Sequence, residues 1–219
     1  MDETLHRVLA DQLKTCGATL RQRRLVWGTS GNISCRLEAD LFLISASGSE
    51  LGRLKDRDLA RCRISQDSWE GTRRPSMEVG LHRSIYGSCP EAGAVIHSQP
   101  FYATLVACSD LPLRADLLPE SMAYVGAVAR VPYSHAGSRD LARSTADRAV
   151  TSKALLLDNH GAVCWGGSLD EALLRTEALE FLCRLLVAAH SGGISLNCLG
   201  DRVMNDFLQH LRQSGAGSA

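Results

Sequence analysis

The pattern of apolar and polar positions along the chain predicts alternating helices and strands. Residues 2–24 carry leucine and valine at helical spacing with charges between them, which is typical of an amphipathic helix. Helical spacing returns at residues 75–86, 100–107, 138–150 and 168–190. Short apolar runs predict strands within residues 27–36, 41–45, 62–65, 94–97, 127–132, 153–157 and 161–165.

Local signals indicate where elements begin and how strands pair. Pro75 and Ser76 are typical of a helix start, and Ser168 is a good cap residue for the long helix that follows. Residues 51–59 are polar and predict a loop. Only three residues separate the runs 153–157 and 161–165, and such short turns imply antiparallel or mixed pairing. We therefore expect one α/β domain in which helices cover a mixed sheet.

Composition and charge narrow the classes of partner. The 219 residues include 24 basic and 24 acidic side chains, and this balance argues against nucleic acid as a partner. No apolar run is long enough to span a membrane, and the polar N-terminus lacks the apolar segment of a signal peptide. The eight cysteines are scattered without a C-x-x-C pair, which favours free thiols over a disulfide framework. We expect a cytoplasmic protein.

Two histidines are candidates for metal binding. His97 and His160 each end a short apolar run, and Glu78 lies near the start of a predicted helix shortly before the His97 strand. Two imidazoles and one carboxylate can bind zinc, manganese, iron or cobalt, provided that a coordination position stays open for substrate. The alternative is that each histidine is a hydrogen-bonded structural residue.

A second group of residues could bind an anion. Small residues cluster in segments 28–34 and 45–49, and Ser76 adds a further hydroxyl. Exposed backbone N–H groups and hydroxyls suit a phosphate or carboxylate. Neither a phosphate-binding P-loop nor a dinucleotide-binding motif is present, so nucleotide binding is not indicated. Segment 28–34 alone is also compatible with a simple tight turn.

The order of these motifs resembles the class II aldolase/adducin family. The resemblance covers about residues 5–190, and it rests on segments 28–36, 44–48, 75–78, 94–97, 131–133 and 157–161. It implies a three-layer α/β/α domain, which we place over residues 1–213, with a central mixed, largely antiparallel sheet. The Gly/Ser-rich composition of residues 214–219 predicts a disordered tail. It also implies a homotetramer with active sites at subunit interfaces.

The resemblance assigns roles to individual residues. His97 and His160 match metal-binding histidines, and Glu78 matches a carboxylate that is a ligand or an acid/base group. The expected cofactor is a divalent metal ion, with zinc first and manganese, iron or cobalt as alternatives. The positions that match phosphate-binding residues are Gly31, Asn32, Ser47, Gly48 and Ser76.

The chain departs from the family pattern at three positions. The usual third histidine is replaced by Gln99. Its carbonyl oxygen can coordinate a metal but is a poorer donor for zinc than imidazole, so we expect weaker metal binding or a preference for a harder metal. Met77 replaces the second of two serines. No match to the proton-donating tyrosine is found; Glu120 resembles the acid/base glutamate of a dehydratase branch, or is a surface-loop residue. His82 matches a position that is usually structural.

The resemblance implies a metal-dependent lyase that forms an enediolate from a small sugar phosphate or hydroxy-keto acid. Aldol cleavage is the leading reaction, and decarboxylation, dehydration and epimerisation use the same intermediate. The alternative from another class is a non-catalytic binding or assembly module, like the head domain of adducin. Gln99 and Met77 favour that alternative, whereas retention of Glu78, His97 and His160 opposes it.

Overall fold

The computed structural model describes residues 3–213 and contains one eight-stranded sheet. The strands lie in the order β4-β3-β2-β1-β5-β8-β7-β6. All neighbouring pairs are antiparallel except β6 and β7, which are parallel. The strands are β1 (Asn32–Glu38), β2 (Leu41–Ser45), β3 (Leu59–Arg63), β4 (Trp69–Glu70), β5 (Ala94–Ser98), β6 (Val128–Val131), β7 (Ala154–Leu157) and β8 (Gly161–Gly166).

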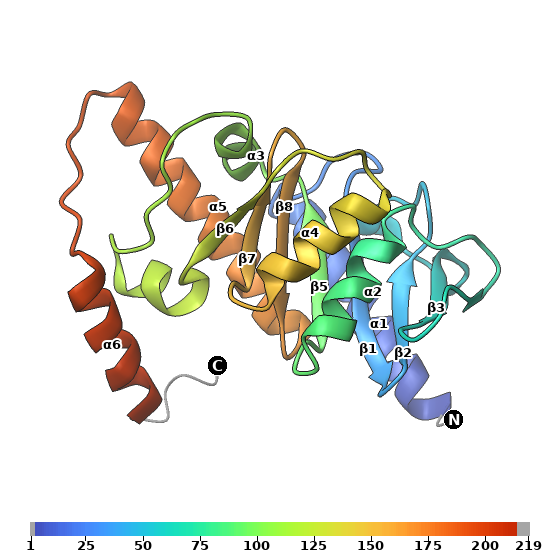
Figure 1. Cartoon of the computed structure of the whole chain (residues 1–219). Coiled ribbons are helices and arrows are strands. Elements are labelled where there is room, and N and C mark those ends of the chain that lie inside the picture. The colour runs from blue at the N-terminus through green and yellow to red at the C-terminus, as the bar shows by residue number, and fades with distance from the viewer. Residues whose placement is uncertain (1–2, 214–219) are drawn as a thin grey trace.

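Helices cover both faces of this sheet. Figure 1 shows α2 and α4 side by side on one face, and α1, α3 and α5 pack against the other. The expected α/β/α arrangement with a mixed, largely antiparallel sheet is thereby confirmed. The helical elements are α1 (Glu3–Gln22), α2 (Val79–Ser88), α3 (Phe101–Ala107), α4 (Arg139–Ala149), α5 (Leu169–Ser191) and α6 (Asp201–Gln213), with short helical turns η1 (Leu51–Arg53), η2 (Asp56–Asp58) and η3 (Ser121–Val125).

The alternation of side chains along β5 determines which way His97 faces. Successive residues of a strand point to opposite faces of the sheet. Val95 packs into the core under α2 and α4, together with Leu81 of α2, whereas Ile96 packs into the core on the α1 side. His97 therefore lies on the same face as Val95, where the chain enters α2.

Serine caps begin the two longest predicted helices of the second half of the chain. The Ser138 hydroxyl accepts a hydrogen bond from the N–H of Leu141 at the start of α4, and the Ser168 hydroxyl accepts one from the N–H of Glu171 at the start of α5. Each such cap contributes about 1 kcal/mol of helix stability. The predicted starts of both helices are confirmed to within a residue.

The predicted start of the helix at Pro75 is wrong. Helix α2 begins at Val79, and Pro75 instead forms an isolated bridge with Ala46. The N–H of Ser76 donates to the carbonyl of Ser45 at 3.1 Å, so this segment is extended beside the end of β2. Hydrogen bonding to a distant loop has overridden the local helix signal. This arrangement brings Glu78 directly before the helix.

Two further differences lie outside the site. Leu59 to Arg61, which the sequence placed in or after a loop, belong to strand β3, because they pair with β2. Helix α6 was not predicted; it has no buried residue and packs against η3. The expected disordered tail at residues 214–219 lies outside the described residues.

The structure can be compared with two expectations from the sequence, that no segment spans a membrane and that the cysteines are free thiols. No helix within residues 3–213 is long and apolar enough to cross a membrane. All eight cysteines are free thiols, and six of them are buried, as expected from their positions within apolar runs.

Candidate metal centre and anion pocket

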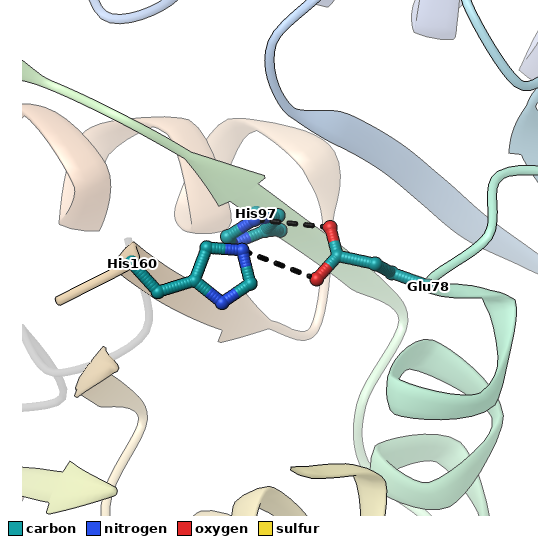
Figure 2. A group of neighbouring side chains, drawn as sticks. All are labelled: Glu78, His97 and His160. Atoms are coloured by element: carbon teal, nitrogen blue, oxygen red, sulfur yellow. Dashed lines mark ion pairs between the residues drawn. The ribbon is translucent and has the colours of Figure 1, made fainter. Parts of the chain in front are cut away.

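Glu78, His97 and His160 form a compact group where the central strand β5 ends and β8 begins (Figure 2). Glu78 directly precedes α2, His97 lies on β5, and His160 lies in the turn between β7 and β8. Glu78 Oε2 is 3.1 Å from His97 Nε2, and Glu78 Oε1 is 3.4 Å from His160 Nε2. One potential ligand atom from each residue lies within 4.8 Å of the others. The structure thus brings together the three residues predicted to bind a metal.

A tight turn places His160 beside β5. Strands β7 and β8 are antiparallel, and the turn between them includes Asn159 with a positive φ of 55°. Gly161 has a φ of +157°, and a Cβ atom at that position would lie 2.7 Å from the carbonyl oxygen of Ser98. Glycine is required here because any side chain would separate β8 from the end of β5. This close approach positions the imidazole of His160 near that of His97.

A backbone hydrogen bond at one ring nitrogen of His97 directs the other ring nitrogen toward Glu78. The Nδ1–H of His97 donates to the carbonyl oxygen of Ala162 at 3.0 Å, so Nε2 is the ring nitrogen directed into the site. His97 Nε2 lies 3.1 Å from Glu78 Oε2, and the Gln99 amide nitrogen lies 2.8 Å from the same Nε2 atom. A backbone acceptor at one nitrogen with the other directed into the site is typical of metal-binding histidines.

Electrostatics keep Glu78 ionised although it is buried. Burial raises the pKa of its carboxyl, but the charge of His97 and hydrogen bonds from His97 and Asn32 outweigh that effect and lower the pKa to about 2. Burial lowers the pKa of His97, and the neighbouring Glu78 carboxylate reverses this, so the net pKa is raised. Burial and the charge of His97 lower the pKa of His160. A buried carboxylate beside two imidazoles therefore attracts a cation.

The unsatisfied polar atoms of this group fit a divalent metal. Glu78 Oε1 and Gln99 Oε1 are buried oxygen atoms with no hydrogen-bond partner within the described part of the chain. Buried acceptors of this kind normally have a partner. Two imidazole nitrogens with carboxylate oxygens form a donor set suited to zinc, manganese, iron or cobalt.

The five residues predicted to bind phosphate line a single cavity next to Glu78. Its volume is about 360 Å³, and Glu78 itself forms part of the wall. Gly31 and Gly48 adopt positive φ angles of 78° and 68°. A Cβ at Gly31 would lie 2.7 Å from the carbonyl oxygen of His97, so the loop can approach β5 only with glycine at this position. The lining residues predicted from the sequence are Gly31, Asn32, Ser47, Gly48 and Ser76.

Arg73 stabilises the loop that forms this cavity and was not singled out from the sequence. Its guanidinium donates to the carbonyl oxygen of Ser47 at 2.7 Å, to the hydroxyl of Ser49 at 3.1 Å and to Asp58 Oδ1 at 2.6 Å. The Arg73 guanidinium thus connects the residues on either side of Gly48 with Asp58. Only its position two residues before Pro75 could have drawn attention to it.

Asn32 connects the anion pocket with the metal-binding group. Its amide nitrogen donates to Glu78 Oε2 at 2.9 Å, and its amide oxygen lies 2.6 Å from His82 Nε2. The Asn32 side chain is therefore engaged at both ends, a role that spacing alone did not indicate. His82 is fully buried, as expected for a structural residue, and burial together with the charge of His97 lowers its pKa to about 3.

Two other predicted residues have different surroundings. Met77 is 67% exposed and lines the anion cavity where a second serine would otherwise contribute a hydroxyl. Glu120 is exposed and directly precedes η3, which packs against α5 and α6. Within the described chain, Glu120 is not part of the group formed by Glu78, His97 and His160.

Comparison with known proteins agrees with this geometry. The model of the class II aldolase and adducin N-terminal domain family matches residues 11–187. The chain belongs to this family. The class II aldolase match includes every residue of the metal-binding group and of the anion pocket, and α6 lies beyond it.

Similar members of the class II aldolase family carry two different names. A 3-oxo-tetronate 4-phosphate decarboxylase from Haemophilus influenzae is 34% identical over 195 residues, which cover 87% of this chain and 91% of that protein. An L-fuculose phosphate aldolase from Methanococcus maripaludis is 31% identical over 177 residues, covering 81% and 94%. The solved structure of an L-fuculose 1-phosphate aldolase superimposes with a TM-score of 0.86 at 28% identity, covering 93% of this chain and 96% of that one.

Proposed function

We propose that this protein is a metal-dependent lyase that breaks a carbon–carbon bond in a small phosphorylated hydroxy- or keto-compound. The observation that carries the proposal is the position of Glu78. This residue belongs both to the group with His97 and His160 and to the wall of the small, glycine- and serine-lined cavity. A metal-binding group and an anion pocket that share one residue would hold a reacting carbon and a phosphate a few bonds apart.

Each part of the site has a distinct task in this proposal. His97, His160 and Glu78 would bind a divalent metal. The Gln99 amide oxygen would be a fourth donor with the amide turned, because its nitrogen now lies beside His97 Nε2. That metal would supply Lewis-acid stabilisation of the negative charge that develops on substrate oxygen as the enediolate forms. The backbone N–H groups and hydroxyls around Gly31 and Gly48 would hold the phosphate.

Zinc is the metal we propose first, because two imidazoles dominate the donor set. The amide oxygen of Gln99 is a harder donor than imidazole, so manganese, iron and cobalt remain the alternatives.

Aldol cleavage and decarboxylation are the two candidate reactions. Both leave an electron pair on carbon next to a carbonyl group, but aldol cleavage also needs a base that takes the proton of a substrate hydroxyl. Glu78 is the carboxylate available for that proton, with one of its two oxygens taking the proton and the other binding the metal. Decarboxylation requires no such base. It is favoured by the decarboxylase relatives at 34% identity, and we retain it beside aldol cleavage.

We further propose that Glu120 acts as an acid/base residue through assembly of the protein. Glu120 is exposed in the single chain, so it could reach a site on a neighbouring copy. This requires the homotetramer with interfacial sites that the family resemblance implies. Light scattering measures the oligomeric state and should show a tetramer. In that tetramer, Glu120→Gln should lower turnover without lowering metal content. The cytoplasmic location stays a prediction.

The test of the proposed function combines metal analysis with two assays. Protein purified without chelators is expected to contain about one divalent metal per chain. It should release carbon dioxide from 3-oxo-tetronate 4-phosphate or an aldehyde from L-fuculose 1-phosphate. The variant His160→Ala should lose both metal and turnover, whereas His190→Ala, which changes an exposed histidine of α5, should lose neither.

The opposite result would support the non-catalytic alternative. If the chain contains almost no metal, is not restored by zinc, manganese or cobalt, and turns over neither compound, the proposal is wrong. A binding or assembly module that resembles the adducin head would then be the better interpretation.

A further inference from the structure

A buried chain of hydrogen bonds connects Tyr86 to Glu78. The Tyr86 and Ser34 hydroxyl oxygens are 2.8 Å apart, and the Ser34 hydroxyl is 2.6 Å from His82 Nδ1. His82 Nε2 is 2.6 Å from the Asn32 amide oxygen, and the Asn32 amide nitrogen is 2.9 Å from Glu78 Oε2. Four short contacts therefore lead from the last turn of α2 to the carboxylate that faces the two imidazoles.

The residue spacing on helix α2 and strand β1 places these four side chains next to one another. His82 and Tyr86 lie four residues apart on one side of α2, while Asn32 and Ser34 lie two residues apart on one side of β1. All four residues are 5% exposed or less. Because water is excluded, each polar group depends on its neighbour in the chain for a hydrogen bond.

Elementary hydrogen-bond chemistry determines the direction of every contact. An ionised carboxylate only accepts, so the Asn32 amide nitrogen must face Glu78 and the amide oxygen must face His82. His82 therefore carries its proton on Nε2, and its Nδ1 accepts from the Ser34 hydroxyl. The Ser34 oxygen can then accept from the Tyr86 hydroxyl. Every donor in the chain points toward Glu78.

We propose that Asn32, His82 and Ser34 are positioning residues that hold the Glu78 carboxylate toward His97 and His160 and thereby set the affinity of the site for a divalent metal. None of the three belongs to the proposed metal ligands. The inference rests on the proposed function, because it needs a metal at this group. Hydrogen bonds to a ligand from the residues behind it fix the orientation of that ligand, and their loss typically weakens metal binding by about 10- to 100-fold.

Through this series of hydrogen bonds, the Ser34 hydroxyl influences the orientation of the Glu78 carboxylate. Without the Ser34 hydroxyl, the Nε2–H form of His82 loses its donor at Nδ1. The opposite tautomer would require the Asn32 amide to turn, and its oxygen would then face Glu78 Oε2 at about the same separation. Two acceptors cannot share such a contact without losing a hydrogen bond. Removal of Ser34 Oγ should therefore disturb a carboxylate that it does not touch.

The experiment measures binding of cobalt(II) alone to the full chain by competition with a coloured chelator. Ser34→Ala and His82→Leu should each weaken cobalt binding by about tenfold or more, and Asn32→Asp should weaken it further because a second carboxylate then faces Glu78. The matched control is Thr145→Val, which removes a fully buried hydroxyl on α4 that has no hydrogen-bond partner among the described residues. Its cobalt affinity should equal that of the wild type.

A spectroscopic measurement keeps the proposal testable if a variant fails to fold. In the nitrogen-15 imidazole spectrum of the metal-free wild type, His82 should be the neutral Nε2–H tautomer. The Nδ1–H tautomer would overturn the proposal, as would a folded Ser34→Ala protein with unchanged cobalt affinity. If the wild type binds no cobalt, the proposed function fails instead. The tautomer of His82 still tests the direction of the hydrogen bonds from Tyr86 to Glu78.

Discussion

Gln99 is the residue on which metal preference depends. Its amide nitrogen lies 2.8 Å from His97 Nε2, and its oxygen has no hydrogen-bond partner in the described chain. The side chain packs against Gly161, where a Cβ would lie 3.1 Å from Gln99 Cγ. Residue 99 is therefore held beside the ligand atom of His97.

Changing Gln99 to histidine should tighten zinc binding. Imidazole is a stronger donor to zinc than an amide oxygen, so we expect the dissociation constant for zinc to fall by about tenfold or more, with a smaller change for manganese. Competition with a chelator measures both constants. Equal affinities in the wild type and in Gln99→His would mean that this side chain does not reach the metal.

Changing Arg73 to methionine should weaken anion binding. The guanidinium joins Ser47, Ser49 and Asp58 around the cavity, and its loss also leaves the Asp58 carboxylate without its cation. We expect weaker binding of inorganic phosphate by calorimetry and a loss of about 1–2 kcal/mol in the free energy of unfolding. Arg53→Met removes the same charge from an exposed position on η1 and should change neither. A loss of equal size in both variants would indicate a general charge effect.

At the scale of elements, one aspartate connects α6 to the rest of the molecule. The Asp116 carboxylate accepts hydrogen bonds from Arg114 at 2.6 and 2.9 Å and from the N–H of Gly200 at 2.7 Å, next to the start of α6. The hydrogen bond from Arg114 lowers the pKa of Asp116, and the Gly200 N–H adds to this against the effect of burial. Since α6 has no buried residue, this connection is a main constraint on its first turn.

The depressed pKa of Asp116 has a consequence for pH. The connection contributes its full stability above the ordinary aspartate pKa of about 3.9 and loses it as the pH falls through the lower folded value. Hydrogen exchange should therefore show α6 protected at neutral pH and less protected in acid. At neutral pH, Asp116→Ala should speed exchange in α6, whereas Asp110→Ala, an exposed change in the same loop, should not. Equal exchange in all three proteins would contradict this role.

At the scale of the whole molecule, the metal-binding group joins parts of the chain that are far apart in sequence. Glu78 precedes α2, His97 lies on β5, and His160 lies between β7 and β8 (Figure 1). A cation bound by all three residues would bind the folded state and not the unfolded chain. Binding should therefore raise thermal stability.

Metal removal should lower the melting temperature. A metal at 100 times its dissociation constant stabilises the folded state by about 2.7 kcal/mol, which corresponds to roughly 5–10 °C for a chain of this size. Calorimetry with and without a chelator should show this difference in the wild type and little difference in His160→Ala. A shift of the same size in the variant would place the stabilising metal elsewhere.

Local patterns in the sequence were sufficient for most of the fold. The strand pair around His160 and the helices α1, α4 and α5 lie close to their predicted ranges, because periodicity, turns and serine caps act over a few residues. The α/β class and the mixed, largely antiparallel sheet follow from the same signals. The candidate ligands were also visible, since His97 and His160 lie at the ends of apolar runs.

Only the tertiary structure decided how those residues work together. The extended conformation at Pro75, the contacts of Arg73 and the chain from Tyr86 to Glu78 all join segments that are distant in sequence. A hydrogen bond across such a distance leaves no periodic trace in the chain, because its partners are brought together only by the sheet and by the helix packed on it. The sequence by itself determined which side chains are available, and the fold determined which of them meet.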